Sequence, residues 1–152
     1  MAHPTERRAL SYQYNPTTSA WEEKRGNAEL TIMASAARTI TPSNSADQIN
    51  YNWRGFVLFV NVTARASAVT LTPSIQSRDP VGGDYITVWT AAAAINTADG
   101  SVAYLFYPSP NTDAGSLYTE EIDLLVSRTW RVRMVHSTTG SITYSVAASM
   151  LL

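Results

Sequence analysis

Hydrophobic and polar residues alternate with a period of two along much of the chain. The clearest runs cover residues 56–63, 69–76 and 142–150, and shorter runs cover 85–89 and 130–134. In the first run, one face carries Phe56, Leu58, Val60 and Val62. Alternation repeated this often predicts half-buried antiparallel β-strands.

Turn-forming residues separate these runs. Residues 79–83 and 98–100 combine Asp with Gly, which favours tight turns between strands. Residues 137–140, with the sequence Ser-Thr-Thr-Gly, predict a hairpin loop between the last two runs. The boundaries of the runs therefore agree with strands that follow one another closely along the chain.

About eight strands follow from this pattern, which favours an all-β antiparallel β-sandwich or jelly roll over residues 27–152. Pro73 lies inside one run and cannot donate a ladder hydrogen bond, so it predicts an edge strand or a bulge there. Residues 91–95 have some helical character but are too short to carry a fold. We predict a single domain preceded by an arm.

Residues 1–26 show neither helical nor alternating periodicity, and we predict that they form an extended N-terminal arm. This segment carries Tyr12, Tyr14 and Trp21. Aromatic side chains on an arm gain little in an isolated monomer. We therefore expect them to dock on a neighbouring molecule or to fold back over the domain.

The composition favours adhesion to other proteins. Charged residues make up 15% of the 152 residues, against about 25% in a typical soluble domain, and neutral polar groups are cheap to desolvate. The net charge of −1 gives no general attraction for nucleic acid, and no apolar stretch has the length of a membrane span. The absence of cysteine excludes disulfides and thiolate chemistry, and the polar N-terminal sequence predicts synthesis in the cytoplasm.

Candidate catalytic groups are few. His3 lies in the arm, and His136 ends a predicted strand, where we interpret it as a structural residue with one ring nitrogen bonded locally. Glu120, Glu121 and Asp123 form the only acidic cluster of the sequence. Glu121 and Asp123 have the spacing to share a strand face like the carboxylates of a glycosidase, but a solvated strand entry or an acidic partner patch is favoured. We predict no enzyme activity, no cofactor and no metal.

Three arginines are candidates for a binding surface. Arg131 and Arg133 project from the polar face of a predicted strand, close to Arg128. Arginine forms bidentate pairs with carboxylates and is enriched at interfaces. A solvated sheet face and a partner-binding patch stay equally open, and nucleic-acid binding is a weaker third interpretation. Together with the three aromatic residues of the arm, these arginines form the predicted partner interface.

Several short motifs resemble, in order, a pattern found in small virion proteins of tailed bacteriophages. They are residues 50–56 (Asn-Tyr-Asn-Trp-Arg-Gly-Phe), 60–63 (Val-Asn-Val-Thr), 75–80 (Ile-Gln-Ser-Arg-Asp-Pro), 128–132 (Arg-Thr-Trp-Arg-Val) and 140–146 (Gly-Ser-Ile-Thr-Tyr-Ser-Val). The resemblance covers about residues 50–150 and leaves out the arm. It implies a virion structural protein, in particular a decoration or cement protein on the capsid surface. Its partners would be the major capsid protein and copies of itself, as a homo-oligomer, with neither nucleic acid nor membrane.

Two other hypotheses stay open. One is a tail or baseplate component, in which Tyr85, Trp89 or Tyr107 stacks on host glycans, although aromatic residues on strands more often belong to the core. The other is a small β-fold hydrolase that uses Glu121 and Asp123.

Overall fold

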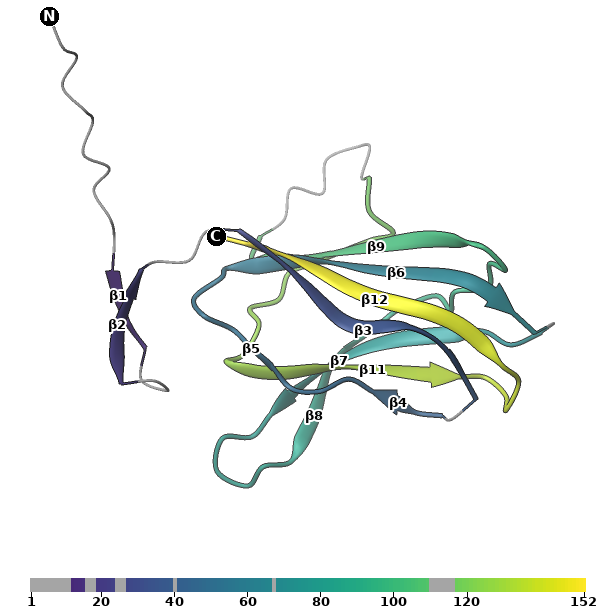
Figure 1. Cartoon of the computed structure of the whole chain (residues 1–152), viewed down its shortest axis with the longest axis horizontal. Helices are drawn as coiled ribbons and strands as arrows, with labels where there is room; N and C mark the ends of the chain where they lie inside the picture. The colour runs from purple at the N-terminus through teal and green to yellow at the C-terminus, as the bar shows by residue number, and fades with distance from the viewer. Residues whose placement is uncertain (1–11, 16–18, 24–26, 40, 67, 110–116) are drawn as a thin grey trace, which may run out of the picture.

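A computed structural model describes residues 12–15, 19–23, 27–39, 41–66, 68–109 and 117–152. These residues form two five-stranded sheets and a separate two-stranded hairpin, with no helix in the described part of the chain (Figure 1). The strands are β1 (Tyr12–Asn15), β2 (Ala20–Glu23), β3 (Ala28–Arg38), β4 (Ser43–Asn44), β5 (Gln48–Ile49), β6 (Gly55–Arg65), β7 (Leu71–Arg78), β8 (Tyr85–Thr90), β9 (Gly100–Phe106), β10 (Glu120–Ile122), β11 (Thr129–His136) and β12 (Ile142–Leu151).

The two five-stranded sheets face one another as a β-sandwich (Figure 1). The first sheet has the strand order β10-β9-β6-β12-β3, and the second has the order β4-β11-β7-β8, with β5 also paired to β11. Among the described strands, every pair is antiparallel except β9 and β10. The predicted antiparallel β-sandwich is therefore confirmed. The strands beyond the expected eight are mostly short segments at the sheet edges and in the hairpin.

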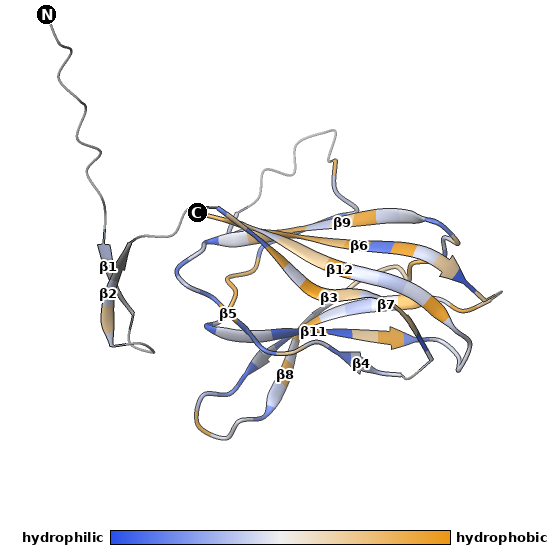
Figure 2. Cartoon of the chain, viewed as in Figure 1, coloured by the Kyte–Doolittle hydropathy of each residue, from blue (hydrophilic) through white to orange (hydrophobic). Residues whose placement is uncertain are grey.

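The alternating runs bury one face between the sheets, as predicted. Apolar and polar segments alternate along β6 in Figure 2, and Phe56, Leu58, Val60 and Val62 are fully buried while Phe59 is 41% exposed. The same holds for β11 and β12, whose fully or almost fully buried hydrophobic residues are Trp130, Val132, Met134, Ile142, Tyr144, Val146, Ala148 and Met150. Removing this apolar surface from water is the main force that holds the sheets together.

Aromatic rings join the two sheets at one end of the core. Phe56 of the first sheet stacks on Trp130 of the second with ring centroids 4.6 Å apart, and it stacks on Phe106 at the same distance. Trp89 of β8 meets Phe106 edge-on at 4.8 Å. Large aromatic side chains dominate core energetics, so this cluster fixes how the sheets face one another.

The loop over residues 137–140 is not a hairpin loop, so that prediction is wrong. It joins β11 to β12, but β11 pairs with β7 in the second sheet and β12 pairs with β3 and β6 in the first. The loop therefore crosses from one sheet to the other. Alternation shows which face of a strand is buried and is the same for a hairpin partner and for a strand of the opposite sheet.

Pro73 does not mark an edge strand, because β7 lies between β11 and β8. A register shift does interrupt the β7–β8 ladder just after Ile75. The carbonyl of Pro73 accepts a hydrogen bond from Ala91 N at 3.0 Å, and the next contact on that side is the bridge from Leu71 to Ile95. Between these two contacts the chain leaves the ladder, so the missing N–H of proline costs no sheet hydrogen bond.

Candidate interaction surfaces

The predicted arm contains a β-hairpin. Strands β1 and β2 pair antiparallel, with Tyr14 opposite Trp21 and Asn15 opposite Ala20 in register. In the described part of the chain, β2 is the only strand that pairs with β1. Figure 1 draws the hairpin beside the sandwich, at the end where β3 starts and β12 finishes. His3 and residues 1–11 lie outside the described residues.

The hairpin presents aromatic surface. Tyr12 is 56% exposed and Trp21 is 71% exposed. Because side chains alternate along a strand and paired residues share a face, positions 12 and 21 belong to the same face of the hairpin. The side chain of Tyr14 lies outside the described residues. An isolated two-stranded hairpin is marginally stable at best, so covering this face would stabilise it.

Arg131 lies on the outward face of β11 and is held by the two neighbouring strands. Its Nε donates a hydrogen bond of 2.9 Å to Gln76 Oε1 on β7. Its guanidinium carbon lies 3.4 Å from the ring centroid of Tyr85 on β8. A guanidinium over an aromatic face is attracted by the ring quadrupole. Arg131 is therefore positioned by contacts within the chain.

An acidic residue extends this cluster. The Tyr85 hydroxyl donates a hydrogen bond of 2.5 Å to Asp47 Oδ1, and Asp47 Oδ2 lies 3.5 Å from Arg78 Nη1. The hydrogen bond to Asp47 raises the pKa of Tyr85 above its ordinary value, and desolvation adds to the shift. We call Asp47, Gln76, Arg78, Tyr85 and Arg131 the polar face cluster. Its members come from β7, β8, β11 and the segment before β5.

The three predicted arginines lie on β11 or just before it. Arg133 is half-buried on the same outward face of β11 as Arg131, two residues further along. Arg128 is exposed just before β11, and its carbonyl accepts a hydrogen bond of 2.7 Å from Asn50 N. The joint interface of the hairpin aromatic residues and the arginines stays a prediction.

Sequence reasoning missed the partners of Arg131. The alternation places Gln76 on the polar side of its run, and the turn at residues 79–83 makes β7 and β8 neighbours. Arg78 and Tyr85 then face one another in register. The sequence pattern could therefore have predicted this part of the cluster. No sequence pattern could have predicted the contact of Asp47, because Asp47 lies in an irregular segment far away along the chain.

His136 is buried at the end of β11. Its Nε2 lies 3.4 Å from the Tyr144 hydroxyl, and in the described part of the chain its Nδ1 has no hydrogen-bond partner. Burial lowers the pKa of His136, and the nearby positive charge of Arg38 lowers it further. Both effects favour the neutral imidazole.

The acidic cluster accepts hydrogen bonds from backbone amides and from one indole side chain. Glu120 accepts one of 2.8 Å from Ala92 N and one of 3.3 Å from Trp89 Nε1. Asp123 Oδ1 accepts a hydrogen bond of 2.9 Å from Ser109 N. These contacts tie β10 and the residue after it to neighbouring segments. Glu121 is half-buried in β10.

The aromatic residues suggested for glycan stacking contact other side chains. Trp89 packs edge-on against Tyr104 with ring centroids 5.1 Å apart. Tyr85 lies under Arg131, and Tyr107 lies under Arg54 at 5.4 Å from its guanidinium carbon. Each of these three rings therefore already has a side-chain contact within the chain.

The fold and these surfaces define a β-sandwich domain with an exposed aromatic hairpin and an arginine-bearing sheet face. In the part of the chain that the structure describes, no group of three or more His, Cys, Asp and Glu side chains is placed to hold a metal ion, and no helix is long and apolar enough to cross a membrane. Comparison of the sequence with models of known protein families and with curated proteins found no match.

Proposed function

We propose that this chain is a structural protein of a tailed-bacteriophage virion, specifically a capsid decoration protein. It binds the major capsid protein at junctions between capsid subunits, and it binds copies of itself. The observation that carries the proposal is the aromatic hairpin, with Trp21 71% exposed. Covering the exposed part of the indole and the marginal hairpin with another surface would stabilise both. The resemblance of residues 50–150 to phage virion proteins supports a virion as the assembly to which the hairpin binds.

The sandwich suits this role mechanically. Its core is a continuous apolar cluster with stacked rings between the sheets, and a close-packed core transmits force without yielding. Its low content of charged residues reduces the cost of desolvating a large contact area. On a repeating capsid lattice, several weak contacts act together through multivalency.

Co-sedimentation with capsids tests the proposal. Expanded capsids that lack this protein are mixed with the full-length chain and pelleted. We expect the wild type to pellet with the capsids and Trp21→Ala to bind at least tenfold more weakly. Val81→Ala is the matched control, because Val81 is 95% exposed on the turn between β7 and β8. Failure of the wild type to pellet would remove the proposal.

The resemblance alone also allows a tail or baseplate component. Immunogold labelling of intact particles separates the two locations: label on the head supports the decoration role, and label confined to the tail replaces it. A glycan array then tests host-glycan binding by the tail component.

A further inference from the structure

The outward face of the first sheet is uncharged at its centre. Strands β9, β6 and β12 lie side by side there (Figure 1), and their outward residues align across the strands in three rows. These rows are Val57, Leu105 and Ser149; Phe59, Ala103 and Ala147; and Asn61, Ser101 and Ser145. We call these residues the neutral face. Charged residues are depleted at the cores of protein interfaces, so the neutral face indicates a surface that another molecule covers.

A groove lies beside Phe59 on this face. It is lined by Glu29, Phe59, Ala147, Ala148 and Ser149, and its volume is about 220 Å³. Phe59 is 41% exposed. Ala147 lies in register between Phe59 of β6 and Thr31 of β3, and its small side chain leaves the space open. The groove therefore offers apolar contact to a ring from outside the chain.

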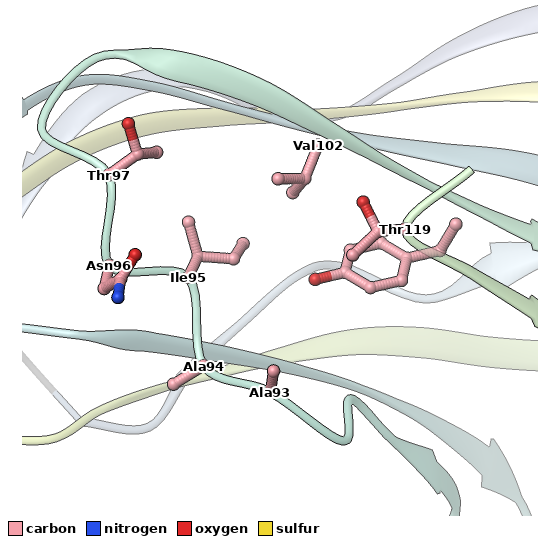
Figure 3. A pocket seen from close by; sticks show the side chains of 8 residues that line it. Ala93, Ala94, Ile95, Asn96, Thr97, Val102 and Thr119 are labelled. Carbon is pink, nitrogen blue, oxygen red and sulfur yellow. The ribbon is translucent and has the colours of Figure 1, made fainter. Parts of the chain in front are cut away.

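The size of the groove fits an indole. A dry cavity of about 150 Å³ holds one benzene ring, and the fused ring pair of an indole needs about half as much volume again. The hollow lined by Ala94, Val102 and Thr119 measures only about 150 Å³ (Figure 3). The Tyr104 hydroxyl at that hollow is buried without a hydrogen-bond partner in the described chain, so a molecule in the hollow does not reach it.

The hairpin of a second copy offers a side chain that suits the groove beside Phe59. Trp21 is 71% exposed, and its indole combines apolar ring faces with a single N–H donor. The groove presents Phe59 and Ala147 to the ring faces and the carboxylate of Glu29 as an acceptor for the N–H. Within one copy, none of the described hairpin residues lines the groove. A chain's own hairpin therefore leaves its groove open.

The contact area favours a reciprocal pair. At exposed fractions of 56% and 71%, Tyr12 and Trp21 of one hairpin together offer about 250 Å². The face that covers them loses a similar area, so one hairpin contact buries about 500 Å² and two reciprocal contacts bury about 1,000 Å². The larger total reaches the lower limit of specific interfaces, whereas a single contact does not.

The connection between the hairpin and the sandwich allows such a pair to close. Residues 24–27 join the hairpin to β3, the edge strand that carries Glu29. Hairpin and groove therefore belong to the same edge of the first sheet. A two-fold axis beside that edge lets each copy insert its own hairpin and accept its partner's at once.

We propose that two copies of this chain exchange hairpins, so that Trp21 of each copy lies in the groove beside Phe59 of the other and its Nε1–H donates to the Glu29 carboxylate. This inference rests on the self-association in the proposed function and names the two surfaces that make it. It does not depend on binding to capsids.

A double-mutant cycle on the full-length chain tests the pair by sedimentation equilibrium. Trp21→Ala removes the ring and Ala147→Leu fills the groove, and we expect each to weaken pairing at least tenfold. The combined variant should pair no more than about threefold more weakly than the weaker single variant, because residues in contact are not additive. Ala98→Leu, at an exposed position in the turn before β9, is the matched control and should pair like the wild type. Both replaced residues are exposed, so dilute samples should keep the wild-type melting temperature.

Four outcomes would overturn the inference: a wild type that stays monomeric, a loss of pairing with only one of the two single variants, losses that multiply in the combined variant, or weaker pairing by Ala98→Leu. A mixture of ¹³C-labelled and unlabelled chains then separates exchange from folding back. We expect a nuclear Overhauser contact between the labelled Ala147 methyl group and the Trp21 indole of an unlabelled copy. The same contact found only within one chain refutes exchange. Pairing without capsid binding would remove the capsid role alone, and capsid binding by a monomer would remove this inference alone.

Discussion

Tyr85 shows how individual side chains on the outer sheet face depend on one another. Its hydroxyl donates to Asp47, and its ring lies under the guanidinium of Arg131. The carboxylate raises the pKa of Tyr85 and the arginine lowers it, with Asp47 the largest influence. An arginine on a sheet face can thus be positioned by its neighbours and still present donors to a partner.

The two influences on Tyr85 have opposite signs, so two variants should shift its pKa in opposite directions. Asp47→Asn removes the charged acceptor and should lower the pKa of Tyr85. Arg131→Ala removes the positive charge and should raise it further. Ring signals of Tyr85, followed by nuclear magnetic resonance across the alkaline range, measure both shifts. Asp99→Asn is the control, and the same direction of shift in both variants would refute the described contacts.

His136 should make stability depend on pH. Its pKa is below the ordinary value of 6.5 in the folded protein, so the unfolded chain takes up a proton first as the pH falls. The contribution of His136 is fully present above about pH 6.5 and is lost as the pH falls through the folded-state pKa. We expect the free energy of unfolding to fall between about pH 7 and pH 5, and to fall less in His136→Gln. Urea unfolding at each pH measures the difference, and parallel curves would contradict it.

At the scale of the elements, stability depends on how closely neighbouring backbone segments approach one another. A Cβ atom on Gly55, at the start of β6, would collide with the backbone carbonyl of Phe106 and with the ring of Tyr107. Because backbone cannot move aside cheaply, Gly55→Ala should destabilise the protein by about 1–3 kcal/mol. Gly82→Ala, in the β7–β8 turn, meets first the flexible carboxylate of Asp79 and should cost much less. Denaturant unfolding of both variants tests the contrast, and equal losses would refute it.

Glu120 links β10 of the first sheet to the end of β8 in the second. Glu120→Ala removes two hydrogen bonds to a charged acceptor and should lower the free energy of unfolding by about 1–3 kcal/mol. The exposed Glu29 of β3 provides the control variant Glu29→Ala, for which we expect a change within about 0.5 kcal/mol. Thermal and urea unfolding measure both. A loss no larger than the control's would show that this link is unimportant.

At the scale of the whole molecule, the residues of the core differ from the exposed aromatic residues of the hairpin. The core lies between the sheets, whereas Tyr12 and Trp21 are exposed on the hairpin. The double variant Tyr12→Ala/Trp21→Ala should therefore melt within about 2 °C of the wild type but self-associate at least tenfold more weakly. Sedimentation velocity over a concentration series measures association. A wild type that stays monomeric throughout would remove self-association from the proposed function.

Local alternation predicted most strands of the sandwich, but it did not predict how the strands are arranged in the two sheets. Phe56, Leu58, Val60 and Val62 were expected on one face, and all are buried. For residues 85–89 the pattern did not show which side is buried. There Ile86 and Val88 are 61% and 40% exposed, while Trp89 packs on the core, because one tryptophan buries more apolar area than a small aliphatic side chain.

For the candidate surfaces too, the sequence predicted some features and the tertiary structure decided others. The outward placement of Arg131 and Arg133 followed from the period of their strand, and it is confirmed. The contacts of Arg131 with Gln76 and Tyr85 depend on three strands lying side by side. The hairpin within residues 1–26 had no alternating signal, and the hollow lined by Ala94, Val102 and Thr119 draws on three separate parts of the chain.

The sequence by itself determined that this protein is an all-β domain with few charges, because strand period, turn residues and composition are local properties. Only the tertiary structure decided that β11 and β12 belong to opposite sheets, that Arg131 rests on Tyr85, and that Tyr104 is buried without a hydrogen-bond partner in the described chain. The physical reason is that each of these depends on contacts between distant segments, whose energies depend on how the whole core packs and not on any one run of residues.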